Sequence, residues 1–215
     1  MTGETVTGPT AVPEQPGYDA LADEYARRFP SPFLTGLERR AIDAFIDLVR
    51  GSTLAPTVVD VGCGTGGVAA HLAERGLTVR GVDPSARMLA IAQTAHPDLN
   101  LTVGDARLDG VDLASVDGVV ARHSLIHLAP TRVREVLDDW ARRLPVGAVL
   151  LVSAQSSDES GVHEFDHAVA RAWRWHPDAL ADAAAAAGFI ELWRTVSRPD
   201  ADHRFPDVHL AARRA

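Results

Sequence analysis

The sequence predicts an α/β fold, namely a Rossmann-like, mostly parallel sheet of about seven strands with helices on both faces and an antiparallel edge strand. Two observations lead to this fold class. Short apolar runs of strand length alternate with helical patterns over residues 57–154, which is typical of parallel sheets. Two strand-like runs then follow one another near the C-terminus and indicate an antiparallel pair. The 215 residues, 46% of them hydrophobic, can bury one such core.

The N-terminal part is predicted to contain a tail and two helices. Residues 1–16 are rich in proline and threonine and carry few large apolar side chains, so we expect a disordered tail ahead of a domain over residues 17–215. YDALADEYARRF, residues 18–29, has apolar positions at helical spacing. Thr35 and Glu38 have the spacing of a capping box, which predicts the start of a second helix.

The central part is predicted to alternate between strands and helices. The expected strands are TVVDVG (57–62), TVRGVD (78–83), LTVGDA (101–106), VDGVVAR (116–122) and AVLLVSA (148–154). The expected helices cover residues 68–75, 85–93 and 131–144. In sheets of this kind ligands bind beyond the carboxyl ends of the strands, so we expect the functional site there.

The C-terminal part departs from the alternation. We expect a short lid around residues 155–175 and then an alanine-rich helix over residues 177–187, closed by Gly188. FIELWRTVS and VHLAARR, residues 189–197 and 208–214, are the two consecutive strands of the antiparallel pair.

Composition excludes several classes of protein and of site. The formal net charge is −8 and all 21 basic residues are arginine, which argues against a nucleic-acid-binding face. The N-terminus lacks the pattern of a secretory signal, and no apolar run is long enough to cross a membrane. The single cysteine, Cys63, excludes an intrachain disulfide and a cysteine-built metal site. We therefore expect a cytoplasmic protein that is a monomer or a homodimer.

The stretch VVDVGCGTGG, residues 58–67, predicts a loop that binds an adenosine compound. Its glycines fit the dinucleotide pattern G-x-G-x-x-G, and Asp83 ends the next strand, where a carboxylate can accept hydrogen bonds from a ribose diol. NAD would satisfy both features. However, Asp60 places negative charge near the loop, which would repel a pyrophosphate and suit a ligand with an ammonium and a sulfonium. Asp105 adds a carboxylate that an adenine amino group could meet.

These motifs resemble, in order, those of the class I S-adenosylmethionine-dependent methyltransferases. VVDVGCGTGG looks like the first motif of that family, VRGVDPSARML the second, LTVGDA the third and VDGVVARHSLIHL the fourth. YDALADEYARRF is similar to the helix that often precedes the core, so that the resemblance covers roughly residues 18–214. It implies that the cofactor is S-adenosyl-L-methionine.

The resemblance also implies a set of cofactor-binding residues. Those expected at the methionine part are Tyr25, Asp60, Gly62, Gly64 and Arg122. Those expected at the ribose and the adenine are Asp83, Met88, Asp105 and Ala106.

The expected activity is methyl transfer by in-line displacement to a small-molecule acceptor, most naturally at oxygen or nitrogen. The methyl group of a sulfonium is already activated, so the main task is to orient the acceptor. Where a base is needed, His123 after the fourth strand and His167 on the lid are the candidates, whereas His127 is interpreted as mainly structural. The acidic ligands and the asparagine of metal-dependent O-methyltransferases cannot be mapped here, so we predict no required metal.

Three alternatives remain open on the sequence. HEFDH, residues 163–167, matches the zinc-hydrolase pattern H-E-x-x-H. On a helix, His163 and His167 would lie one turn apart and could share a zinc ion. Glu164 would then be the base, and Glu191 a possible third ligand. On such a helix Phe165, Val169 and Trp173 would share one face. A protein that binds S-adenosylmethionine without transferring its methyl group is the second alternative, and an NAD enzyme is the third.

Overall fold

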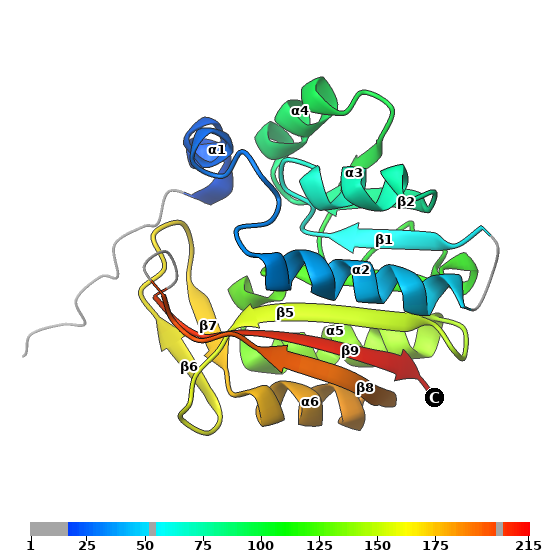
Figure 1. Ribbon diagram of the computed structural model, residues 1–215, viewed down its shortest axis with the longest axis vertical. Helices are drawn as coiled ribbons and strands as arrows, with labels where there is room; N and C mark the ends of the chain where they lie inside the picture. Colours follow the sequence, from blue (N-terminus) through cyan, green and yellow to red (C-terminus); the bar gives the residue numbers. More distant parts are fainter. Residues whose placement is uncertain (1–16, 52–54, 201–203) are drawn as a thin grey trace, which may run out of the picture.

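The computed structural model describes residues 17–51, 55–200 and 204–215, so the predicted tail over residues 1–16 lies outside the described residues. In these ranges seven strands form one sheet in the order β3-β2-β1-β4-β5-β9-β8 (Figure 1). The parallel strands are β1 (Thr57–Val61), β2 (Thr78–Asp83), β3 (Asn100–Val103), β4 (Gly118–Arg122) and β5 (Val149–Gln155).

The last two strands form the antiparallel pair that the sequence predicts. Strand β9 (Asp207–Arg214) pairs antiparallel with β5 on one side and with β8 (Phe189–Val196) on the other, so that β8 is the edge. The predicted fold class is confirmed. Because β9 runs against β5, its first residues lie beside the carboxyl end of β5 and reach the functional edge of the sheet.

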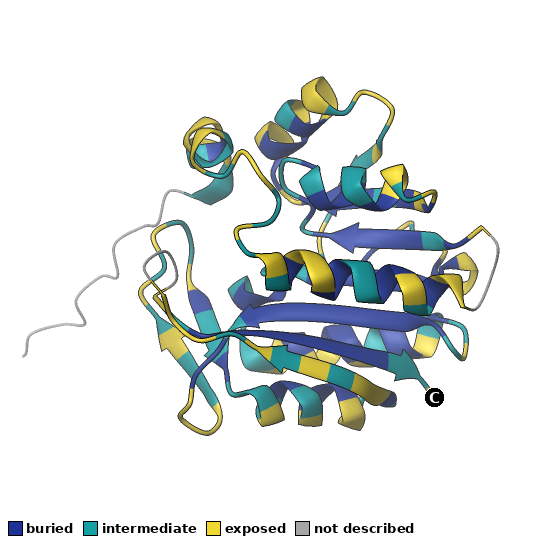
Figure 2. Ribbon diagram, viewed as in Figure 1, coloured by how far each residue is buried: buried dark blue, intermediate teal, exposed yellow. Residues whose placement is uncertain are grey.

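Helices cover both faces of the sheet. The six α-helices of the described ranges are α1 (Gly17–Arg28), α2 (Gly36–Arg50), α3 (Gly67–Glu74), α4 (Ala86–Ala95), α5 (Pro130–Arg143) and α6 (Pro177–Ala186). Helices α2 and α3 pack on one face and α5 and α6 on the other, while α1 lies beside α4 (Figure 1). The strands between these layers are buried, and exposed residues follow the outer faces of the helices (Figure 2).

Close packing brings the start of α2 to the functional edge of the sheet. A Cβ atom added to Gly118 in β4 would lie 2.7 Å from Cζ of Phe45, so the absent side chain lets α2 approach the strand. Phe45 and Ile42 are fully buried in the core beneath the helix. Helix α2 therefore crosses β4 and β5 closely, with its N-terminus near their carboxyl ends (Figure 1).

The predicted capping box fixes that N-terminus. The Thr35 hydroxyl accepts a hydrogen bond from the Glu38 backbone N–H at 3.2 Å, and the Glu38 carboxylate accepts from the Thr35 N–H at 3.4 Å. Thr35→Ala should lower the free energy of unfolding by about 1 kcal/mol, because a backbone donor loses its partner. Urea unfolding measures this loss, and Thr35→Ser is the control that keeps the hydroxyl. Equal stability of both variants would contradict the prediction.

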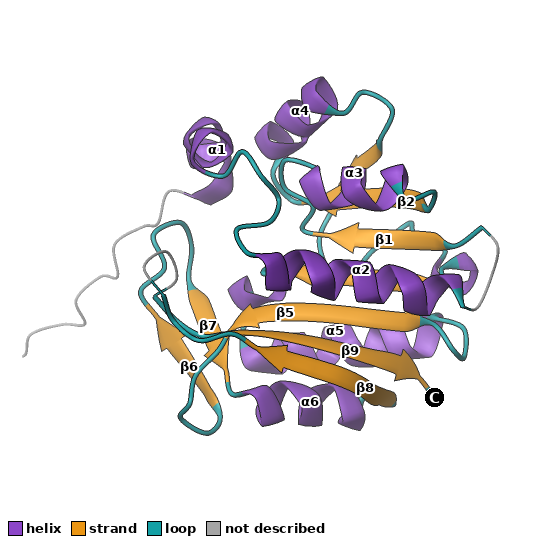
Figure 3. Cartoon of the chain, viewed as in Figure 1, coloured by secondary structure: helices purple, strands orange, loops and turns teal. Residues whose placement is uncertain are grey.

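The segment predicted to be a helical lid is instead a β-hairpin. Strands β6 (Val162–Phe165) and β7 (Ala172–Trp175) pair antiparallel, apart from the main sheet (Figure 3). The helix expected through HEFDH, with Phe165, Val169 and Trp173 on one face, is therefore wrong. The pairing of β6 with the aromatic run AWRW, ten residues further on, outweighs the local helical spacing.

Candidate active site

A cavity of about 720 Å³ lies beyond the carboxyl ends of β1, β2, β4 and β5. Every residue predicted to bind the cofactor lines it, and so do both predicted catalytic histidines, His123 and His167. Helix α1 and the residues that join β6 to β7 also line this cavity. The structure thus brings together around one cavity residues that are up to 142 positions apart, from Tyr25 to His167.

The glycine loop after β1 forms the floor of this cavity. The N–H of Gly62 donates to the carbonyl of Val82 at 2.7 Å, which ties the loop to β2. Gly62 has a φ of +71°, and a Cβ atom there would lie 2.2 Å from Cβ of Ser124 in the turn after β4. This position excludes a side chain for two independent reasons, conformation and space.

Asp83 joins the glycine loop to the turn that follows β2. Its Oδ2 accepts a hydrogen bond from the Gly64 N–H at 2.8 Å, and its Oδ1 accepts one from the Ser85 N–H at 2.8 Å. The side chain is buried, which raises its pKa, while these hydrogen bonds act in the opposite direction. Asp83 is therefore a fixed acceptor in the cavity and also holds the loop in shape.

Asp60 lies deeper in the same wall. It is 2% exposed, and its Oδ2 has no hydrogen-bond partner among the described residues. Burial, together with the nearby charge of Asp83, raises the pKa of Asp60 to about 7. Such a carboxyl group accommodates a cation well, because a positive ligand would favour its ionised form.

The residues predicted to hold the adenine come from α4 and from the turn after β3. Met88 is buried at the start of α4, where its N–H donates to the Ser85 hydroxyl at 3.1 Å. The indole N–H of Trp140 in α5 donates to the carbonyl of Ala106 at 2.8 Å and fixes that turn. Asp105 accepts a hydrogen bond from the Arg107 N–H at 2.8 Å.

Arg122 and Tyr25 form the opposite rim. Arg122 makes an ion pair with Glu38 at 2.8 Å, and it donates to the carbonyl of Pro32 at 2.7 Å. The arginine predicted to meet a ligand carboxylate thus also holds the linker between α1 and α2 in place. Tyr25 packs against Phe29, with ring centroids 4.8 Å apart, and burial raises the pKa of its hydroxyl.

Helix α1 and the hairpin meet over the cavity through three contacts. The Gly17 N–H donates to the carbonyl of Val169 at 3.0 Å. His127 Nδ1 lies 3.0 Å from the carbonyl of Arg171 and must donate to it, so in the neutral ring Nε2 accepts from the Tyr18 hydroxyl at 2.9 Å. Burial lowers the pKa of His127, which keeps it neutral and supports its structural interpretation.

The two histidines predicted as bases have different surroundings. His167 Nδ1 accepts a hydrogen bond from the Val169 N–H at 3.3 Å, and the ring also makes a hydrogen bond with the backbone of Ala170, so the turn between β6 and β7 holds it in place. Burial and the neighbouring His127 lower the pKa of His167. His123 follows β4 with a φ of +52°, a costly conformation for a residue with a side chain. Its imidazole lies close to Glu38 and Asp207.

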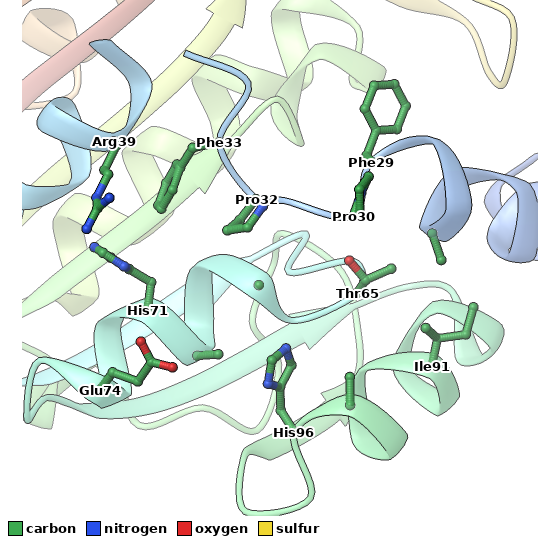
Figure 4. A pocket seen from close by; sticks show the side chains of 14 residues that line it. Phe29, Pro30, Pro32, Phe33, Arg39, Thr65, His71, Glu74, Ile91 and His96 are labelled. Carbon is green, nitrogen blue, oxygen red and sulfur yellow. The ribbon is translucent and has the colours of Figure 1, made fainter. Parts of the chain in front are cut away.

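A second cavity, of about 460 Å³, lies on the other side of the linker between α1 and α2 (Figure 4). Its walls include Thr65, His71 and His96. It shares Phe29 and Pro32 with the first cavity, so this linker is the partition between the two.

Comparison with known proteins shows a methyltransferase domain and a methyltransferase fold. A family model described as a methyltransferase domain matches residues 58–147. The solved structure of 1,6-didemethyltoxoflavin-N1-methyltransferase from Burkholderia thailandensis is similar with a TM-score of 0.67, over 98% of this chain and 93% of that one. Residues 58–147 therefore match a methyltransferase domain, and the whole chain has the fold of the S-adenosylmethionine-dependent methyltransferases. At 18% identity, the likeness to the solved structure shows the methyltransferase fold alone.

Curated methyltransferases match shorter parts of the chain. dTDP-3-amino-3,6-dideoxy-alpha-D-glucopyranose N,N-dimethyltransferase from Streptomyces fradiae is 45% identical over 69 residues, 32% of this chain and 27% of that protein. N-demethylindolmycin N-methyltransferase from Streptomyces griseus is 32% identical over 113 residues, 50% of this chain and 48% of that protein. The chain therefore spans less than half the length of these two methyltransferases.

The zinc-hydrolase alternative does not fit the geometry of this methyltransferase fold. Glu164 on β6 pairs with Arg171 at 2.6 Å, and His163 Nε2 lies 3.0 Å from the carbonyl of Ser160. His163, Glu164 and His167 form no metal-ligand group in the part of the chain that the structure describes. An extended chain explains this, because it rises about 3.3 Å per residue and so separates residues four positions apart, which a helix would place one turn apart.

Several residues of the cavity were missed at the sequence level. They are Tyr18, Glu38, Gln155, Phe205 and Asp207. Glu38 was predicted only as a helix cap, and Asp207 stands just outside the strand predicted over residues 208–214. The only available signal was the clustering of polar residues near predicted strand ends.

Proposed function

We propose that this protein transfers a methyl group from S-adenosylmethionine to a small-molecule acceptor, at oxygen or nitrogen. The observation that carries the proposal is the pair of buried acids, Asp60 and Asp83, on the ends of adjacent strands beside the glycine loop of one cavity. A similar structure, from Burkholderia thailandensis, holds S-adenosylhomocysteine, and its name describes an N-methyltransferase. When bound, the cofactor supplies a methyl group that a positive sulfur has already activated.

The residues of this chain would bind and orient the cofactor. Asp60, Gly62, Gly64, Arg122 and Tyr25 would hold the methionine part, since together they offer a carboxylate, backbone amides, a guanidinium and a hydroxyl. The ribose and adenine would be held by Asp83, Met88, Asp105 and Ala106. The glycine loop would lie against the ligand without side chains in between.

Calorimetry tests the cofactor directly. Titrations with S-adenosylmethionine, S-adenosylhomocysteine and NAD should show binding of the first two and none of NAD. Absence of binding by both sulfur compounds would refute the proposal. Binding without methylation of any acceptor in a mass-shift screen would favour a non-methylating S-adenosylmethionine-binding protein.

Cofactor affinity should depend on pH through Asp60. Its pKa of about 7 lies above that of an ordinary carboxyl, so in the ligand-free protein burial favours the protonated form. The raised pKa of Asp60 stabilises the folded state at low pH, and this stabilisation is lost as the pH rises through about 7. A bound ammonium requires the ionised form, so binding should tighten as the pH rises towards that value.

Calorimetry with S-adenosylhomocysteine between about pH 6 and about pH 8 checks this expectation, with a gain approaching tenfold per pH unit below the pKa. Asp60→Asn should bind more weakly and with a flat profile. Asp105→Asn is the matched control, and it should keep the slope. A slope unchanged in Asp60→Asn would contradict the assignment.

We propose His123 as the residue that takes a proton from the acceptor, ahead of His167. His123 lies within reach of two carboxylates that can stabilise the imidazolium formed by proton transfer, whereas His167 is held by the backbone of the hairpin turn. His123→Ala should lower kcat about 100-fold and remove the acidic limb of the pH profile, because general-base catalysis typically contributes 10²–10⁴-fold. His167→Ala should mainly raise KM. Unchanged turnover of His123→Ala across pH would remove the base role.

We further propose that the protein works in the cytoplasm, as a monomer or homodimer, without a required metal. The single cysteine, Cys63, is buried as a free thiol, and burial raises its pKa, so it is suited to packing rather than to redox chemistry. None of the described helices is both long and apolar enough to span a membrane. Full activity after treatment with EDTA would support the metal-free assignment.

A further inference from the structure

Three ionisable side chains from three elements meet at the end of the cavity beside β5 and β9. Glu38 comes from the first turn of α2, His123 follows β4, and Asp207 begins β9. One potential ligand atom from each lies within 4.8 Å of the other two. All three residues line the cavity, and both carboxylates are buried.

Hydrogen bonds hold one oxygen of the Glu38 carboxylate at the start of α2. Its Oε2 accepts from Arg122 at 2.8 Å and from the Leu34 N–H at 2.6 Å. Oε1 of Glu38 accepts no hydrogen bond from a described residue, so this oxygen can accept one from a ligand. Glu38 is therefore held in position in the free protein, so a ligand need not order this side chain on binding.

Two buried polar atoms near this cluster, on Gln155 and His209, make no hydrogen bond to any residue that the structure describes. Oε1 of Gln155, directly opposite Asp207 in the β5–β9 register, is buried without a hydrogen bond to any described residue, and Gln155 lines the cavity. His209, two pairs further along the same register, is 1% exposed, and its Nε2 likewise makes no hydrogen bond in the described ranges. A buried, unpaired acceptor beside a cavity indicates that a ligand donor belongs there.

The spacing of the three atoms fits an ammonium group. Three acceptors placed tetrahedrally at about 2.9 Å from one nitrogen are about 4.7 Å apart. A divalent metal with bonds of about 2.1 Å draws tetrahedral ligands to about 3.4 Å from one another. The three atoms lie within 4.8 Å of one another, a limit that admits the spacing around an ammonium as well as the shorter spacing around a metal.

We propose that the methyl acceptor is a primary amine that enters as its ammonium and donates hydrogen bonds to Glu38, His123 and Asp207. This inference rests on the proposed function and narrows it from oxygen or nitrogen to nitrogen. His123 takes one proton from the ammonium. The neutral amine then turns so that its freed lone pair, which at first faces His123, points to the methyl group. The new N–C bond forms while the S–C bond breaks, and the electron pair of the S–C bond stays on sulfur to give the neutral thioether. The methylated ammonium then releases a further proton to solvent.

Electrostatics favours this proton transfer. A cationic sulfonium beside an ammonium disfavours the charged form of the amine and so lowers its pKa. The two carboxylates stabilise the imidazolium of His123 that results. Phe165 and Phe205, whose ring centroids lie 5.3 Å apart, line the same cavity and provide apolar surface for the body of the acceptor.

Matched probes test the proposal. Benzylamine, benzyl alcohol and benzoate share one ring and differ in the charge of the polar group. Ligand-detected NMR on the full chain, loaded with S-adenosylhomocysteine, should show benzylamine binding at least about tenfold more tightly than the alcohol, as expected for charge-assisted hydrogen bonds. Benzoate should bind most weakly.

Two variants and one control connect the preference to the cluster. Asp207→Asn should remove most of the amine preference, and Gln155→Glu, which adds a carboxylate opposite Asp207, should increase it. Asp166→Asn is the control, because this exposed rim carboxylate pairs with Arg204 at 2.7 Å outside the cluster. Thermal unfolding verifies that each variant is folded.

The possible outcomes separate this proposal from the proposed function. Binding of S-adenosylhomocysteine with equal affinities for amine and alcohol would overturn the amine assignment and leave methyl transfer in place. Stoichiometric Zn²⁺ binding that is lost in Asp207→Asn would overturn it in favour of a metal at the same atoms. Failure to bind S-adenosylhomocysteine at all would refute the proposed function itself.

Discussion

Replacing Asp83 by asparagine is expected to weaken the binding of S-adenosylhomocysteine at least about 100-fold, because hydrogen bonds to a charged group contribute about 1.5–3 kcal/mol each. In the free protein this carboxylate accepts hydrogen bonds from the N–H groups of Gly64 and Ser85, at 2.8 Å each. An asparagine offers one oxygen and one NH₂ group, so one of these backbone donors would face another donor. The substitution would therefore disturb the glycine loop as well as remove the proposed acceptor for the ribose.

Calorimetry measures this loss, with Asp105→Asn as the matched control. The Asp105 carboxylate accepts a backbone hydrogen bond from Arg107, within its own turn, and it is more exposed than Asp83. Its substitution should cost less than about tenfold, as for a single solvent-accessible hydrogen bond. An affinity of Asp83→Asn within a few-fold of the natural protein would remove Asp83 from the cofactor site.

Gly62→Ala should lower the free energy of unfolding by about 3 kcal/mol or more, because left-handed strain of about 1–2 kcal/mol adds to overpacking. The added Cβ atom would lie 2.2 Å from Cβ of Ser124, far inside van der Waals contact. To relieve this overlap, the turn after β4 must move away from the glycine loop. His123 directly precedes Ser124, so a shift of this turn would also move the proposed base. Gly62→Ala should therefore reduce the rate of methyl transfer as well as stability.

Gly64→Ala separates strain from overlap. Gly64 has a φ of +54°, yet a Cβ atom there has nothing within 4 Å, so this variant should lose only about 1 kcal/mol of stability. Urea unfolding of the two variants provides the comparison. Equal losses of stability in the two variants would show that overlap with Ser124 is not the cause of the loss in Gly62→Ala.

The sequence was sufficient where the signals are local. Strand-length apolar runs and the capping box at Thr35 predict β1 to β5 and the start of α2, because short-range patterns determine these elements. The same local logic placed Asp60 and Asp83 at neighbouring strand ends, since parallel strands all finish at one edge of the sheet. The cofactor half of the site was predictable for this reason.

The acceptor half depends on pairings that are distant in sequence. Nothing local to Asp207 indicates that β9 places it beside Gln155, 52 positions earlier, or near the cap of α2. HEFDH failed as a helix for a related reason, because its partner strand AWRW begins only after an intervening turn. Spacing within five residues cannot show whether hydrogen bonds will form within the segment or with another strand.

The contacts between α1 and the hairpin have a kinetic consequence. Tyr18, His127 and the backbone of Arg171 form a chain of hydrogen bonds across the roof of the cavity, and Gly17 adds a bond to Val169. A molecule that leaves the cavity between α1 and the hairpin requires those bonds to break together and re-form. Opening of the roof is therefore expected to set the dwell time of the spent cofactor, so that product release rather than chemistry limits the steady-state rate.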